Sequence, residues 1–329
     1  METPLSAQPA VLVLTPLHPD VKNGLSGRFE IVEAAPNMAG TLPPAVLSRI
    51  RGVACAGSIP RSLIDVLPRL EIIASFGVGY DGIDVGHAAE RGVVVTNTPD
   101  VLNEEVADTA VWLLIDAARG FSKAQGWLRQ GRWTSDGPYP LSPCSLRGRS
   151  VGIWGLGRIG LAIARRLEAF GLTISYHNRR PVAGVAYRYQ PSLQALAAAV
   201  DTLIAAVPGG SATDGAIDGG VLAALGRAGI FINVGRGSTV DEQALVRCLS
   251  DGTIAAAGLD VFASEPNVRA DLLALGNVAV LPHVAAATVK ARAAVARLVV
   301  ANLDEWFLHA RALTPVPEAD VSKSAISTA

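Results

Sequence analysis

The chain has 329 residues, of which 50% are hydrophobic and 17% charged, and its formal net charge is −1. This length and composition predict a globular protein with two domains and exclude an intrinsically disordered chain. Because the charge is balanced and no run of like charges occurs, neither nucleic acid nor an anionic membrane is an expected partner.

Cysteine usage and the N-terminus predict where the protein resides. Cys55, Cys144 and Cys248 are scattered and fit no metal-binding or disulfide spacing, so we expect no metal site and a reducing compartment. The N-terminus lacks a basic region followed by a long apolar run, and the apolar segments elsewhere are short. Neither a signal peptide nor a membrane span is therefore expected, and the protein is predicted to be cytoplasmic.

After a polar arm at residues 1–9, short apolar strands alternate with helical stretches over the first hundred residues. Strands are expected at residues 11–14, 29–34, 53–56, 70–76 and 93–96, with helices such as 44–50, 61–67 and 85–91 between them. This alternation predicts a parallel sheet covered by helices on both faces, and hence a first, smaller α/β domain.

A long helical stretch follows this domain. It begins near Asn103, which can cap it, and continues to about Gln130, with Gly120 and Gly126 expected to interrupt it. Its apolar stripe consists of Val106, Ala110, Leu113, Leu114 and Ala117. Residues 131–149, rich in Gly, Pro and Ser, predict an extended loop.

Residues 150–180 carry the pattern around which the chain is organised. An apolar strand is followed at once by Gly155-Leu156-Gly157-Arg158-Ile159-Gly160, an amphipathic helix and a second strand. This order is typical of a dinucleotide-binding βαβ unit and disfavours a merely structural turn. Gly155 permits the sharp turn, Gly157 lets the backbone approach a pyrophosphate, and Gly160 lets the helix pack closely on the sheet. The N–H groups that begin the helix would face the phosphates.

The end of the second strand indicates which dinucleotide binds. An NAD site places Asp or Glu at this point, but no acidic residue lies between Glu168 and Asp201. The strand ends instead in His177-Asn178-Arg179-Arg180. Because guanidinium groups bind a 2′-phosphate with forked donors, we predict that NADP(H) is the cofactor, with NADPH preferred over NADH. The alternative is that the two arginines form only a solvated loop.

Strands and helices continue to alternate after this unit. Strands are expected at residues 202–207, 230–234, 256–261 and 277–281, and helices at 193–200, 218–225 and 241–249. An alanine-rich helix from Thr288 to Leu308 is expected to return to the first domain, and the polar tail after Pro315 to be loose. The predicted fold class is α/β, with two doubly wound parallel sheets.

Three chemically active residues follow three of these strands. Arg236 comes after the strand at 230–234, Glu265 after 256–261, and His283 after 277–281. Ligands of parallel sheets bind outside the carboxyl ends of the strands, where the glycine turn also lies. Each residue alone is more often structural, but together they suit reduction of a 2-oxo acid. Arg236 would clamp the carboxylate, His283 would give the proton, and Glu265 would favour its imidazolium form.

These motifs resemble the D-isomer-specific 2-hydroxyacid dehydrogenase family over nearly the whole chain. The matching stretches are SFGVGYDGID (75–84), VGIWGLGRIG (151–160), NVGRG (233–237), GLDVFASEP (258–266) and PHVAAAT (282–288). The glyoxylate/hydroxypyruvate and hydroxyphenylpyruvate reductase branch is the most similar, and 2-ketogluconate reductases are similar too. The chain departs from many members in having Ala285 and Ala286 for Gly-Ser, and a glycine pair after Pro208 for Leu-Thr.

The resemblance implies roles for individual residues. Arg236, Glu265 and His283 are the implied catalytic set, with the carboxylate also held by the backbone N–H groups of Val78 and Gly79. The implied cofactor contacts are Gly155, Leu156, Gly157, Arg158, Ile159, Asn178, Arg179, Arg180, Val207, Pro208, Val234 and Asp260. Without the resemblance, a tight turn that needs glycine would be the preferred interpretation of Val78-Gly79, and Asp260 could be a capping residue.

The resemblance also implies a domain arrangement. Residues 1–102 plus 288–329 would form the substrate-binding domain, and residues 103–287 the NADP-binding domain, with a cleft between them. A homodimer is implied, with residues 103–149 as its arm. The substrate side chain would meet loops at 51–58, 75–80, 133–141 and 283–287. Candidate contacts there are Arg51, Ser58 and Tyr80, and Trp133, Tyr139 and Leu141 from the same or a partner subunit, unless these are ordinary loop residues.

Several functions fit these expectations. The first is NADPH-dependent reduction of a small 2-oxo acid such as hydroxypyruvate or glyoxylate, with 2-ketogluconate and hydroxyphenylpyruvate as alternative substrates. A second is an NAD(P)-sensing binding protein similar to the C-terminal binding protein corepressors. A third is a phosphite dehydrogenase of the same fold. Formate oxidation is disfavoured, because the similar formate dehydrogenases have Gln where this chain has Glu265.

Overall fold

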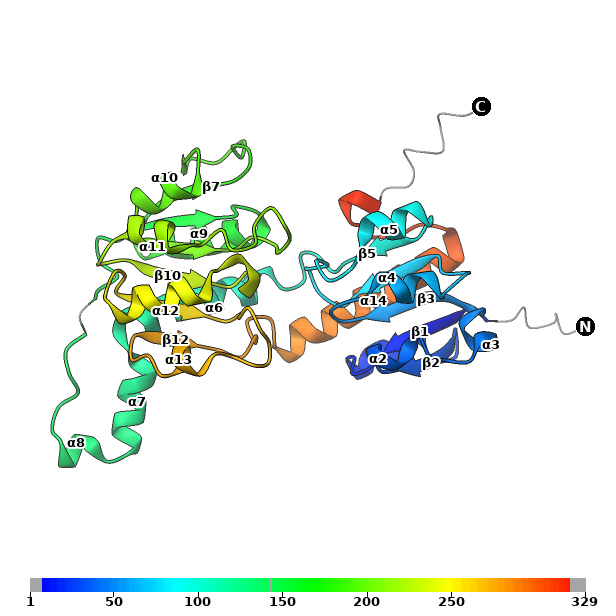
Figure 1. Cartoon of the computed structure of the whole chain (residues 1–329), viewed down its shortest axis with the longest axis horizontal. Helices are drawn as coiled ribbons and strands as arrows, with labels where there is room; N and C mark the ends of the chain where they lie inside the picture. Colours follow the sequence, from blue (N-terminus) through cyan, green and yellow to red (C-terminus); the bar gives the residue numbers. More distant parts are fainter. Residues whose placement is uncertain (1–7, 143, 320–329) are drawn as a thin grey trace, which may run out of the picture. The chain divides into compact units, whose positions relative to one another are not determined.

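The computed structural model describes residues 8–142 and 144–319, and the chain divides into two compact units. Unit 1 contains the residues up to Leu102 and those from Thr288 onward, and unit 2 contains Asn103–Ala287. Each unit is built on its own parallel sheet with helices on both faces, so the predicted fold class of two parallel-sheet α/β domains is confirmed (Figure 1).

Unit 1 has a five-stranded sheet of order β2-β1-β3-β4-β5. Its strands are β1 (Ala10–Leu14), β2 (Glu30–Ala34), β3 (Ile50–Cys55), β4 (Ile72–Ser75) and β5 (Val94–Thr96). Its helices are α1 (Pro19–Leu25), α2 (Pro36–Ala39), α3 (Pro44–Leu47), α4 (Arg61–Asp65), α5 (Val85–Glu90), α14 (Val289–His309) and the 3₁₀ turn η2 (Pro317–Ala319). Two apolar clusters, one on each face of the sheet, form its core.

The last long helix belongs to unit 1, as the sequence predicts. The apolar face of α14 places Val299 and Leu303 against Val11 and Ile72 of the sheet. The segment after Pro315 is not loose, because Val316 is buried and its N–H pairs with the Val95 carbonyl at 3.0 Å. That expectation is therefore wrong for residues 316–319, and its remainder lies outside the described residues.

Unit 2 has a seven-stranded parallel sheet of order β12-β11-β10-β9-β6-β7-β8. Its strands are β6 (Ser150–Trp154), β7 (Thr173–His177), β8 (Arg188–Tyr189), β9 (Thr202–Ala205), β10 (Ile230–Asn233), β11 (Ala256–Leu259) and β12 (Val278–Val280). The chain builds outward from β6 in one direction and then from β9 in the other. The carboxyl ends of β6 and β9 therefore form the switch point where such sheets bind ligands.

Helices cover both faces of this second sheet, and two further helices extend away from it. They are α6 (Asn103–Arg119), α7 (Phe121–Arg129), α8 (Arg132–Ser135), α9 (Arg158–Ala169), α10 (Leu193–Ala198), α11 (Gly219–Leu225), η1 (Gly237–Thr239), α12 (Glu242–Ser250) and α13 (Ala270–Leu273). In Figure 1, α7 and α8 extend away from the body of unit 2.

The predicted long helix breaks at one of its two glycines. Gly120 has φ +65° and separates α6 from α7, as expected. Gly126 lies inside α7, so the second predicted break is wrong. A single glycine inside a helix costs only about 1 kcal/mol relative to alanine, which neighbouring turns can offset. The predicted loop at 131–149 also contains one helical turn, α8.

Candidate active site at the carboxyl edge of the larger sheet

The glycine turn has the geometry that its sequence predicts. Gly155 has φ +97°, and a Cβ there would lie 2.7 Å from the Val207 side chain. A Cβ on Gly160 would lie 2.3 Å from the Gly155 carbonyl oxygen, so only glycine lets α9 approach this closely. Gly157 faces open space and has no side chain with which to cap α9. The first turn of α9 thus has no side-chain cap, and such a helix start is where anionic ligands bind.

Asn178 connects this turn to the end of β7. Its Oδ1 accepts from the Leu156 N–H at 2.6 Å, and its Nδ2 donates to the Leu156 carbonyl at 3.3 Å. The Leu156 N–H is therefore engaged by Asn178, and the Leu156 side chain is buried. The two residues fix the turn relative to the following strand.

Arg179 and Arg180 lie exposed directly after Asn178. No hydrogen bond or ion pair among the described residues involves either guanidinium. Two such cations, beside an anion-binding turn and without a carboxylate nearby in the sequence, are a donor set that fits a 2′-phosphate. The residues present thus fit the predicted dinucleotide.

The other predicted cofactor residues lie along the same edge. Val207 and Pro208 follow β9, and the Val207 side chain contacts the glycine turn at Gly155. Val234 follows β10, and its N–H donates to the Ala205 carbonyl at 3.2 Å. Arg158 and Ile159 begin α9.

Asp260 follows β11 and is buried, with 1% of its surface exposed. Its carboxylate accepts from the backbone N–H groups of Val284 at 2.8 Å and Ala285 at 2.9 Å, and its carbonyl accepts from the His283 N–H at 2.8 Å. Burial raises the pKa of this carboxyl, while the two backbone donors act to lower it. Asp260 thereby holds the turn that carries His283, which has φ +53°. This structural role of Asp260, which fixes the turn at His283, was not predicted from the sequence.

His283 and Glu265 form a close pair at this edge. His283 Nδ1 lies 2.6 Å from Glu265 Oε2, and Glu265 Oε1 accepts from the Phe262 N–H at 2.9 Å. Half of the His283 side chain remains exposed. With Nδ1–H donating to Glu265, the ring is oriented by the carboxylate and Nε2 is left as its other nitrogen.

Arg236 is held beside the same turn. Its carbonyl accepts from Asn233 Nδ2 at 2.9 Å and from Thr239 Oγ1 at 2.7 Å. The next residue, Gly237, packs so closely that a Cβ there would lie 1.8 Å from the Phe262 carbonyl carbon. The residue after Arg236 therefore packs directly on the turn that leads to Glu265. Arg236, Glu265 and His283 follow the neighbouring strands β10, β11 and β12, so all three lie at one edge of one sheet.

Unit 1 presents the loop predicted to hold a carboxylate. The Gly77 N–H donates to Thr98 Oγ1 at 3.1 Å, and the Val78 carbonyl accepts from Asn97 Nδ2 at 2.8 Å. Among the described residues no hydrogen bond uses the N–H of Val78 or Gly79. These two amides are free donors on a loop whose other polar groups are fixed.

The predicted side-chain contacts of the substrate have other partners. Arg51 pairs with Glu71 at 2.5 Å, Ser58 donates to the Gly82 carbonyl at 2.9 Å, and Tyr80 donates to Glu318 at 3.1 Å. Trp133 and Leu141, by contrast, are largely exposed.

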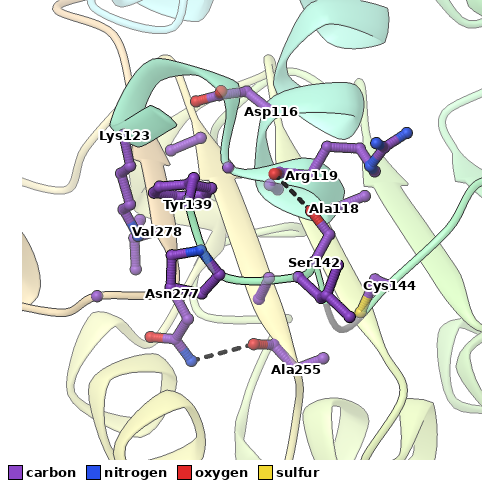
Figure 2. Close-up of a pocket in the computed structure, with 17 residues that line it drawn as sticks. Asp116, Ala118, Arg119, Lys123, Tyr139, Ser142, Cys144, Ala255, Asn277 and Val278 are labelled. Carbon is purple, nitrogen blue, oxygen red and sulfur yellow. Dashed lines mark hydrogen bonds between the residues drawn. The ribbon is translucent and has the colours of Figure 1, made fainter. Parts of the chain in front are cut away.

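A cavity of about 250 Å³ lies at the opposite edge of the unit 2 sheet. Figure 2 shows it between the end of α6 and the segment around Tyr139 and Ser142, with Ala255 and Asn277 at the starts of β11 and β12. Because the glycine turn and His283 lie at the carboxyl ends of the strands, this cavity is separate from the predicted site.

Within the described ranges there is no group of three or more His, Cys, Asp or Glu that could hold a metal ion. Over the same ranges no helix has the length and apolar character needed to cross a membrane.

Known proteins share both the sequence and the fold. The model of the D-isomer specific 2-hydroxyacid dehydrogenase NAD-binding domain matches residues 111–285. The chain is 43% identical to glyoxylate/hydroxypyruvate reductase A of Arabidopsis thaliana over 93% of this chain and 98% of the relative. It is 41% identical to hydroxyphenylpyruvate reductase of Plectranthus scutellarioides, with the same coverage.

A solved structure extends this similarity. The NADPH-dependent glyoxylate/hydroxypyruvate reductase of Sinorhizobium meliloti, in complex with NADP and malonate, superimposes with a TM-score of 0.93. It is 55% identical and covers 95% of this chain and 98% of its own. The chain therefore belongs to the D-isomer-specific 2-hydroxyacid dehydrogenase family and is an oxidoreductase.

Proposed function

We propose that this protein reduces a small 2-oxo acid, hydroxypyruvate or glyoxylate, to the D-2-hydroxy acid with NADPH. The observation that carries the proposal is the 2.6 Å pair of His283 and Glu265 on the sheet edge that also holds Arg236 and the glycine turn. The relatives named as glyoxylate/hydroxypyruvate reductases support the substrate class.

NADPH is the proposed cofactor, held by the first turn of α9 and by Arg179 and Arg180. When bound, the reduced dinucleotide supplies the hydride. Val207 and Pro208 would line its adenine side, and Val234 its nicotinamide side, where the Asp260 carboxylate is already occupied by two backbone amides. The NADP complex of the 55% identical reductase supports this choice.

The protein's own residues would position the acid and move the proton. Arg236 and the free amides of Val78 and Gly79 bind the substrate carboxylate, so unit 1 acts as the substrate-binding domain. His283 Nε2–H gives its proton to the oxygen of the carbonyl group as it becomes a hydroxyl. Glu265 holds the imidazole through Nδ1 and so orients Nε2.

We further propose that two copies associate through the segment 103–149 in the cytoplasm. No residue of α7 is buried in the single chain, and large apolar side chains of this segment are exposed. They are Trp112, Phe121, Leu128, Trp133 and Leu141. A second copy would cover such a surface.

Steady-state rates with hydroxypyruvate, glyoxylate, hydroxyphenylpyruvate and 2-ketogluconate, each with NADPH and with NADH, test the proposal. We expect the highest kcat/KM for hydroxypyruvate or glyoxylate with NADPH. Binding of NADPH without turnover of any acid would favour the sensor function instead. Reduction of NADP by phosphite would contradict the oxo-acid assignment.

A further inference from the structure

A second cavity, of about 310 Å³, lies wholly within unit 1. Its lining comes from four separate segments: the loop after β1, the residue after β3, the residue after β4, and the first turn of α14. The residues are Pro16, Leu17, His18, Ala56, Phe76 and Arg292. The cavity has an apolar floor and two nitrogen-bearing side chains, a composition typical of small-ligand sites.

Arg292 is the cationic group of this cavity. It is half-buried, and its guanidinium lies 5.8 Å from the centre of the Phe76 ring. Elsewhere in unit 1, guanidinium groups such as that of Arg51 have carboxylate partners. In the part of the chain that the structure describes, Arg292 has no ion pair and no hydrogen bond. A half-buried guanidinium that lines a cavity and contacts an aromatic ring, but has no hydrogen-bond or ion-pair partner, is suited to bind an oxygen-bearing ligand.

His18 supplies a second donor. Its ring stacks on Phe76, with centroids 6.1 Å apart and an interplanar angle of 15°. Its Nδ1 accepts from the Asp20 N–H at 3.3 Å, so the neutral ring carries its proton on Nε2. The Asp20 carboxylate lies 3.8 Å from Nδ1, on the side of the ring away from Nε2.

The cavity adjoins the loop that is proposed to hold the substrate carboxylate. Phe76 directly precedes Gly77-Val78-Gly79, and its own N–H is fixed to the Cys55 carbonyl at 2.7 Å. A 2-oxo acid bound through the Val78 and Gly79 amides would thus be held two to three residues along the chain from Phe76 in the cavity wall.

We propose that this cavity receives the side chain of the 2-oxo acid, with Arg292 and the His18 Nε2–H bound to its oxygen atoms. The inference rests on the proposed function and assigns its specificity to two residues outside the catalytic set. It predicts that substrates with a hydroxyl or further oxygen beyond the carbonyl carbon use the cavity. Glyoxylate, which has only a hydrogen there, does not reach it.

The test compares hydroxypyruvate with glyoxylate in Arg292→Leu. We expect kcat/KM for hydroxypyruvate to fall about 10- to 100-fold, and that for glyoxylate to stay within about threefold, because only the former loses a charge-assisted hydrogen bond. Arg292→Lys should recover part of the loss. Arg297→Leu is the matched control, since Arg297 is exposed on the same helix and has no partner among the described residues.

A second variant and a binding measurement guard against misfolding. His18→Asn keeps a side chain able to cap α1 but removes the imidazole, and should shift selectivity in the same direction. In ¹⁵N-histidine spectra, D-glycerate should move the His18 signal of the wild type, and glycolate should not. Equal losses for both acids in Arg292→Leu, or an unchanged ratio, would overturn the inference. Absence of wild-type turnover with either acid would instead refute the proposed function.

Discussion

The carboxyl edges of the two sheets are built in different ways. In unit 2 the edge is made by short continuous motifs: the turn from Gly155 to Gly160, the run from Arg236 to Gly237, and the turn from Asp260 to Glu265. In unit 1 the cavity is assembled from His18, Phe76 and Arg292, which are far apart in the sequence. Binding a dinucleotide and moving a proton depend on backbone geometry that a motif encodes, whereas selecting a side chain depends on whichever residues the fold brings together.

The tight packing of the unit 2 edge gives the largest expected effect. Gly237→Ala would place a Cβ 1.8 Å from the Phe262 carbonyl carbon, so the backbone of Arg236 or the Glu265 turn must move. A displacement of about 1 Å at such a site can cost about 100-fold in rate, and we expect a loss of at least that size in kcat/KM for both acids. Gly276→Ala in the same unit, with no atom within 4 Å of the added Cβ, should leave the rate unchanged. A Gly237→Ala enzyme with normal kinetics would show that this edge tolerates rearrangement.

Cofactor selectivity tests the comparison between the two units further, because the residues proposed to bind the 2′-phosphate all belong to unit 2. The double substitution Arg179→Ser with Arg180→Ser should raise the KM for NADPH about 10- to 100-fold while the KM for NADH and the ratio of hydroxypyruvate to glyoxylate stay constant. Arg188→Ser, at an exposed position of β8, is the control. If the double variant kept its NADPH preference, the 2′-phosphate would be bound elsewhere.

The smallest expected effect is a difference in thiol reactivity between cysteines of the two units. Cys55 is fully buried next to the cavity residue Ala56, and burial raises the pKa of its thiol to about 12, with the Ser75 hydrogen bond acting against this. Burial also raises the pKa of Cys248, whereas Cys144 is only half-buried. At pH 8 a thiol reagent should therefore label Cys144 first in the native protein and all 3 cysteines after unfolding.

The raised pKa of Cys55 also predicts a pH dependence of stability. The pKa of the Cys55 thiol is about 12 in the folded protein and 9.0 in the unfolded chain. The thiol therefore contributes its full stability below pH 9, and this contribution is lost as the pH rises toward 12. Between pH 9 and 12, the unfolding free energy of the wild type should fall relative to that of Cys55→Ala by about 1.4 kcal/mol per pH unit. The difference between wild type and Cys144→Ala should not change in this way. Rapid labelling of native Cys55 would contradict its assigned burial.

Much of the fold follows from the sequence because apolar strands and amphipathic helices alternate with clear boundaries. The interruption at Gly120 was predictable from the cost of glycine in a helix, but the same reasoning failed at Gly126, which adopts ordinary helical geometry. The burial of Val316 could not be predicted from the sequence either, because it depends on a hydrogen bond from its N–H to the distant Val95 carbonyl.

The candidate site also has residues that could be predicted from the sequence and residues that could not. The three residues Arg236, Glu265 and His283 could be placed together because each follows a strand of one parallel sheet. The clamp of Asp260 on the His283 turn could not, since its partners are backbone amides 24 and 25 residues away. Arg292 carries no motif of its own, and only the fold shows that it is half-buried over Phe76 while Arg297 on the same helix is exposed.

The central claim is that His283 moves the proton at the unit 2 edge, and His283→Gln tests it most directly. The measurement is kcat with hydroxypyruvate, together with the NADPH dissociation constant from fluorescence titration of the same preparation. The account predicts a loss in kcat of about 100- to 10,000-fold with the dissociation constant within about threefold of wild type. Turnover close to that of the wild type would contradict it and assign the proton transfer to another group.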